Sequence, residues 1–131
     1  MDKMTDVDNP KDFSDVLQHI QRSRQKIFAQ INTALIELYW HIGQIISYKV
    51  NSQGWGKKVV TDLAQYIAQQ DPELKGFSDK NLWRMKQFFE TYQGNEKLSP
   101  LVRELSWTNN TIIFSRCKTA EEREYYLRLC I

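Results

Sequence analysis

The chain has 131 residues, 41% of them hydrophobic and 12% aromatic, which suits one folded domain with a core but not two domains. The formal net charge is only +2, far from the strongly basic balance of many nucleic-acid-binding domains. No stretch approaches the roughly 18 consecutive apolar residues of a membrane span, and the N-terminus lacks the layout of a signal peptide. The two cysteines, Cys117 and Cys130, form no CxxC pair, so the sequence predicts a reduced, cytoplasmic protein without a disulfide or zinc framework.

The first expected element is a long amphipathic helix that follows a flexible leader over residues 1–11. The apolar residues recur in steps of three and four, the spacing of one helical face, and only Arg24 interrupts them. This stripe consists of Phe13, Val16, Leu17, Ile20, Ile27, Phe28, Ile31, Leu35, Leu38, Ile42, Ile45 and Ile46. A continuous helix over it would be about 50 Å long, so part of the helix is expected to project or to contact a partner. Gly43 is the expected place for a bend or an early end.

Two shorter amphipathic helices are expected next, separated by a turn that contains proline and glycine. The first spans about Lys57 to Gln70 and stops at Asp71-Pro72, because the residue before a proline avoids helical geometry. The second is capped by Ser78 and runs to about Tyr92. Its expected inner face consists of Leu82, Met85, Phe88, Phe89 and Tyr92. The connecting turn is longer than the three or four residues of a compact helix-turn-helix.

Three further helices are expected in the last third of the chain. Ser99-Pro100 opens a short one, with proline at the first helical position. Thr108 is expected to cap the next helix, and the capping box from Thr119 to Glu122 starts the last one.

The sequence therefore predicts an all-α, multi-helix domain over residues 12–131, with a long N-terminal helix and helix-turn-helix-like pairs. No segment shows the clean alternation of a strand. The last helix is still running at Ile131, which suggests a piece of a longer protein.

No catalytic residue, metal site, cofactor or small-molecule substrate is expected from the motifs. The run from Asp71 to Lys75 contains the E-x-K element of metal-dependent nucleases, but it falls in a turn between helices. The carboxylates of such nucleases converge on a cation from adjacent strands. His19 and His41 lie about 33 Å apart along one helix, so they cannot share a metal.

Polar and basic residues on the outer faces of the helices are the remaining candidates for a function. Lys and Arg side chains neutralise phosphates, and the amides of Asn and Gln can read base edges. A first candidate DNA-binding set consists of Lys57, Lys58, Lys80, Asn81, Arg84 and Gln87. A second set, on a later helix, consists of Asn109, Asn110 and Arg116. The alternative interpretation is an ordinary solvated face.

Five motifs in order resemble the N-terminal domain of the YhcG-type bacterial proteins, over about residues 15–131. They are Asn32…Leu38-Tyr39-Trp40-His41-Ile42-Gly43, Trp55-Gly56-Lys57, Gly76-Phe77-Ser78…Asn81-Leu82…Met85…Phe88, Leu105-Ser106-Trp107-Thr108 and Glu121 to Tyr126. In that family the helical domain typically precedes a PD-(D/E)xK nuclease domain, which this sequence lacks, so no catalytic residue is carried over. Asn109 stands where the family often has His, which weakens any role assigned to that position.

Two functions follow as expectations. The first is a non-catalytic DNA-binding module of a nuclease or restriction-like protein, with DNA and the missing nuclease domain as partners. The second is a protein–protein interaction module, in which the long first helix and the last helix build a homodimer or dock the missing domain. Neither interpretation involves a membrane.

Overall fold

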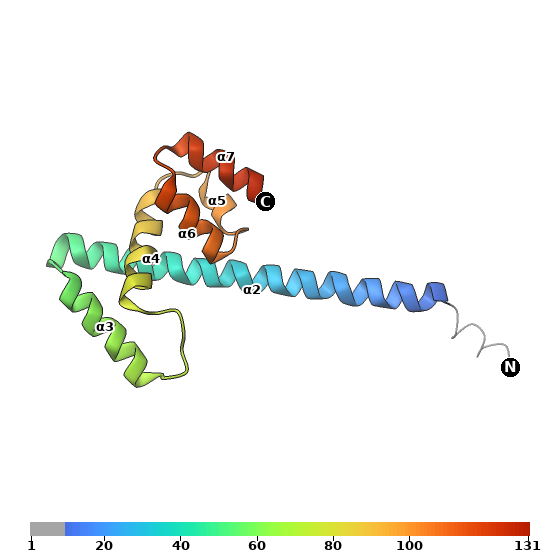
Figure 1. Cartoon of the computed structure of the whole chain (residues 1–131), viewed down its shortest axis with the longest axis horizontal. Coiled ribbons are helices and arrows are strands. Elements are labelled where there is room, and N and C mark those ends of the chain that lie inside the picture. The colour runs from blue at the N-terminus through green and yellow to red at the C-terminus, as the bar shows by residue number, and fades with distance from the viewer. Residues whose placement is uncertain (1–9) are drawn as a thin grey trace. The chain divides into compact units, whose positions relative to one another are not determined.

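The computed structural model describes residues 10–131, which form six α-helices and no strand, so the all-α prediction is confirmed. The helices are α2 (Pro10–Gln53), α3 (Lys57–Gln70), α4 (Asp79–Tyr92), α5 (Ser99–Val102), α6 (Trp107–Arg116) and α7 (Ala120–Cys130) (Figure 1). The expected leader lies outside the described residues except for Pro10 and Lys11, which already belong to α2. None of the helices within residues 10–131 is both long and apolar enough to cross a membrane.

The chain divides into two units, residues 1–31 and residues 32–131. The described part of the first unit is the N-terminal stretch of α2, where every residue from 10 to 31 is exposed. This stretch has no core of its own. The second unit contains the rest of α2 and the other five helices.

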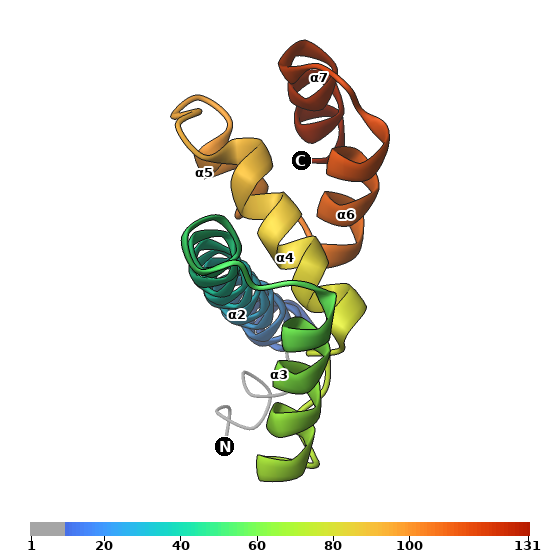
Figure 2. The same ribbon diagram turned by 90° about the vertical axis from the view of Figure 1, so that its left-hand side faces the viewer.

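Helix α4 is the centre of the second unit, where it packs against α3 on one side and α6 on the other (Figure 2). Its buried residues, Leu82, Met85, Phe88 and Tyr92, follow the three- and four-residue spacing of one helical face and are all 0% exposed. The Phe88 ring lies within 6 Å, centroid to centroid, of Trp40, Tyr92, Trp107 and Phe114. Phe88 thus joins α2, α4 and α6 in one aromatic cluster.

Gly43 does not bend or end α2, which continues to Gln53, so that expectation is wrong. A Cβ atom at Gly43 would collide with the backbone carbonyl of Met85 in α4. One turn earlier, the Trp40 ring meets Phe89 of α4 edge to face, with centroids 5.1 Å apart. The absence of a side chain at Gly43 therefore lets α2 and α4 approach closely, and the glycine does not bend the helix.

The part of α2 within the second unit buries a face that overlaps the predicted stripe only in part, at Ile46 and the half-buried Ile42. Ile36, Tyr39 and Ile46 are buried, whereas Leu38 and Ile45 of the stripe are 44% and 56% exposed. The prediction identified a real apolar face, but the second unit covers the neighbouring one. Amphipathic spacing shows that a face is apolar and does not show which element covers it.

Side-chain caps define the starts of three helices. Ser78, Ser106 and Thr119 accept hydrogen bonds from the backbone N–H groups three residues ahead, each at 3.1 Å. The caps at Ser78 and Thr119 match the prediction. The cap of α6 is Ser106 and not Thr108, because the chain turns into the helix at Trp107.

Candidate nucleic-acid interface

The outer face of α4 carries Lys80, Arg84 and Gln87, as predicted. Lys80 and Gln87 are exposed and Arg84 is half-buried, on the side opposite Leu82 and Met85. The four ion pairs within residues 10–131 engage Lys86, Lys97, Arg103 and Arg128. Lys80 and Arg84 take part in none of them, so their charges are available to a ligand.

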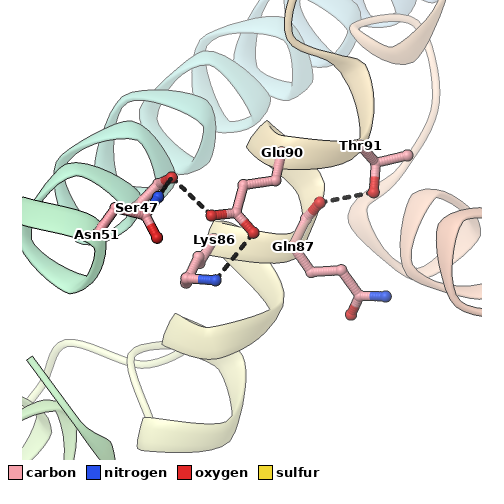
Figure 3. Close-up of polar contacts among 6 residues, drawn as sticks. All are labelled: Ser47, Asn51, Lys86, Gln87, Glu90 and Thr91. Atoms are coloured by element: carbon pink, nitrogen blue, oxygen red, sulfur yellow. Dashed lines mark hydrogen bonds and ion pairs between the residues drawn. The ribbon is translucent and has the colours of Figure 1, made fainter.

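Lys86 lies on the same helix but, unlike Lys80 and Arg84, takes part in an ion pair. Its Nζ lies 2.9 Å from the Glu90 carboxylate, and Ser47 Oγ of α2 donates to the other carboxylate oxygen at 2.7 Å (Figure 3). Burial alone would raise the pKa of Glu90, but these hydrogen bonds outweigh it and hold that pKa below its ordinary value. Glu90 therefore ties α4 to α2 through Ser47, and Lys86 neutralises its charge, whereas the Gln87 amide points away from this network (Figure 3).

A hydrogen bond brings the start of α3 to the start of α4. Thr61 Oγ1 lies 3.3 Å from a carboxylate oxygen of Asp79, which directly precedes Lys80. Lys57 and Lys58 lie one turn before Thr61 and are both exposed. Neither takes part in an ion pair among the described residues.

We call the surface that carries Lys57, Lys58, Lys80 and Arg84, with Gln87 as its neutral member, the basic face. Asp79 is the one acid at its centre, and its second carboxylate oxygen accepts the Lys80 backbone N–H at 2.8 Å. Its charge is thus held at the N-terminus of α4, where a helix dipole favours an anion. Asp62, exposed on α3 one turn after Lys58, is a second acid beside this face, so four cations stand against two acids and the face keeps an excess of positive charge.

Asn81 has a structural role that sequence reasoning missed. Its Oδ1 accepts a hydrogen bond from Trp107 Nε1 at 2.9 Å, and its Nδ2 donates to the Gly76 carbonyl. Both halves of the amide are therefore engaged within the domain, joining α4 to α6 and to the turn before α4. This engagement removes Asn81 from the set expected to read bases.

Asn110 is 0% exposed, and no ligand can reach it in this fold. Its Nδ2 donates to the carbonyls of Val102 at 2.9 Å and Ser106 at 3.1 Å. Its assignment as a DNA contact is therefore wrong. A signal for burial was present in the sequence, because Asn110 precedes Ile113 and Phe114 by three and four residues, the spacing of the apolar face.

Asn109 and Arg116 are exposed, but they belong to a different surface. Both line a hollow of about 370 Å³ whose walls come from α6, α7 and the turn between them, including Cys117 and Tyr126. No residue of α3 or α4 lines this hollow. The fold therefore separates the two predicted sets.

Lys75 is a cation near the basic face that sequence reasoning left out. It lines a groove of about 390 Å³ between α3 and the turn that precedes α4, together with Thr61 and Asp79. The only signal was its place directly before Gly76, a glycine with φ of +93° at the turn.

The E-x-K element lies in the exposed turn between α3 and α4, with Asp71, Glu73 and Lys75 all exposed. Within residues 10–131, no group of three or more His, Cys, Asp or Glu residues comes together in a way that could hold a metal ion.

Comparison with known proteins assigns the chain to a family. No curated protein and no solved structure matches it. The model of the DUF1016 N-terminal domain, which is the YhcG-type N-terminal family, matches residues 15–131. The five motifs pointed to the same family, and with nearly the whole chain matched, the protein belongs to the DUF1016 N-terminal domain family.

Proposed function

We propose that this domain binds the phosphate backbone of DNA through the basic face and acts as the non-catalytic, DNA-holding part of a YhcG-type protein. One observation carries the proposal. Lys57, Lys58, Lys80 and Arg84 take part in no ion pair among the described residues, and the Thr61–Asp79 hydrogen bond gathers them at the starts of two adjacent helices.

The chemistry of this face favours backbone contact over base reading. Lys and Arg neutralise phosphates and release counterions, which makes affinity steeply dependent on salt. The amide of Asn81 is engaged inside the domain, so Gln87 is the one amide on the face that is open to a base edge. We therefore expect weak sequence preference.

The family resemblance supplies the proposed context. In YhcG-type proteins the helical domain typically precedes a PD-(D/E)xK nuclease domain, and a module that holds the phosphate backbone would raise the local concentration of substrate for that domain. Cleavage is assigned to the nuclease domain and to no residue of this chain.

The test is DNA binding by the Lys80→Glu/Arg84→Glu variant across a salt series. Affinity at low salt should fall at least tenfold, which is about 1.4 kcal/mol, and the slope of log affinity against log salt should flatten by about two units. Lys97→Glu/Arg128→Glu is the matched control, because it makes the same change in charge at residues that pair with Glu124. Equal losses in both variants, or an unchanged slope in the first, would contradict the proposed site.

The second candidate function is a protein–protein interaction module. The observation that favours it is the row of exposed apolar residues on α2. Binding through this row would persist at high salt, because apolar contact is not screened by ions. Salt dependence therefore separates the two functions.

A further inference from the structure

Helix α2 carries an apolar row that no described residue covers. The row consists of Phe13, Val16, Leu17, Ile20, Ile27, Phe28, Ile31, Leu35, Leu38, Ile45 and Tyr48, each between 38% and 62% exposed. Single exposed apolar residues are common on proteins, but a continuous row of this length marks an interaction site.

The row follows a seven-residue repeat, the pattern of a coiled-coil seam. One set of positions recurs at 17, 24, 31, 38 and 45, and the second at 13, 20, 27, 34, 41 and 48. Arg24, Ala34 and His41 are the members without a large apolar side chain. A repeat sustained through five heptads favours another long helix as the partner over a globular surface.

We propose that the partner is the α2 helix of a second copy of this chain, packed antiparallel so that Arg24 of one copy lies opposite Ala34 of the other. The three exceptional residues decide the orientation. A parallel pair in register would place Arg24 against Arg24 and His41 against His41, and would leave a gap between two Ala34 residues. The antiparallel pair puts the long Arg24 side chain beside the small Ala34.

This single register also matches the rest of the seam. It pairs Ile27 with Ile31, Ile20 with Leu38, Leu17 with His41 and Phe13 with Ile45, and it places the two Phe28 rings near the two-fold axis. Each large apolar residue at the repeat positions from 13 to 45 then meets the seam of the other copy. A self-complementary surface of this kind is what a two-fold dimer requires.

The pairing explains why residues 10–31 have no cover within their own unit. Their row would pack on the exposed row at residues 34–48 of the other copy, and the reverse contact would form by symmetry. The seam from residue 10 to residue 48 is about 57 Å long. The interface is independent of the basic face, so it can exist whether or not the domain binds DNA.

Cysteine cross-linking tests orientation and register together. In a Cys130→Ser background, Leu17→Cys and His41→Cys variants are oxidised separately and after mixing. The proposal expects a covalent dimer only in the mixture, because position 17 faces position 41 of the other copy. Self-cross-linking of each variant alone would indicate a parallel pair and overturn the proposal.

Light scattering tests whether the dimer forms without a cross-link. The wild-type chain of 15.6 kDa should have twice that mass at micromolar concentration, at both low and high salt. Ile20→Asp should give monomers, whereas Gln25→Asp, the same substitution type on the other side of the helix, should leave the dimer intact. Circular dichroism of each variant checks that the second unit still folds. A wild-type monomer at high micromolar concentration would overturn the proposal.

Discussion

Helix α4 and the stretch of α2 from residue 10 to residue 31 have similar apolar spacing and opposite environments. Leu82, Met85 and Phe88 of α4 are 0% exposed, whereas Leu17 and Ile20 of α2 are about half exposed at 54% and 49%. Helices α3 and α6 pack on α4, whereas every residue of the α2 stretch is exposed. The comparison teaches that apolar periodicity marks a helical face whose burial is favourable. Other elements of the domain can bury such a face, or it can stay exposed for a partner to bury.

The largest expected effect comes from truncating the same residue type in both regions. Phe88→Ala removes the ring at the centre of the aromatic cluster and should destabilise the domain by about 3–5 kcal/mol. Phe28→Ala removes an exposed ring and should change the free energy of unfolding of the second unit by no more than about 0.5 kcal/mol. Chemical denaturation at a concentration where the chain is monomeric measures both. Similar losses of unfolding free energy in Phe88→Ala and Phe28→Ala would show that the two regions do not differ in burial.

Alanine substitutions at two glycines test how closely α2 and α4 approach each other. Gly43→Ala pushes a methyl group into the Met85 carbonyl and should destabilise the domain by about 1–3 kcal/mol. Gly56→Ala is the control for a steric clash, because nothing lies within 4 Å of the position of its Cβ. Its cost is limited to the preference for glycine over alanine at the N-cap of α3. If Gly43→Ala unfolds at the same denaturant concentration as the control, the helices do not approach as closely as described.

The smallest expected effect is a pH dependence of the same contact. The pKa of Glu90 is lower in the folded state than in the unfolded chain, so its ionised form stabilises the domain at neutral pH. That contribution is lost as the pH falls through the folded-state pKa, below the ordinary value for glutamate. Glu90→Gln should therefore melt slightly below the wild type at pH 7, and the two melting temperatures should converge in acid. A gap that widens toward low pH would contradict this sign.

The outer side of α4 illustrates how far residue types can predict a site. Helical spacing alone placed Lys80, Arg84 and Gln87 away from the buried side of α4, where Lys80 and Gln87 are exposed and Arg84 is half-buried. It did not identify the roles of Asn81 and Asn110, because an amide is equally suited to binding a base and to satisfying a buried carbonyl or indole. Their partners lie on other elements, at Trp107 for Asn81 and at Val102 for Asn110, and spacing along one helix does not reveal such partners.

By itself, the sequence determined the helical class, the bounds of α3 and α4, the start of α7 and the family. These features depend on local chemistry: Ser78 and Thr119 cap helices with their own side chains, Asp71-Pro72 ends α3, and the motifs occur in order. Only the tertiary structure decided which face of α2 is buried, why Gly43 lacks a side chain, and which polar residues remain free. Those features depend on the close approach of segments that are distant in sequence, and the local pattern of any one helix carries no information about its neighbour.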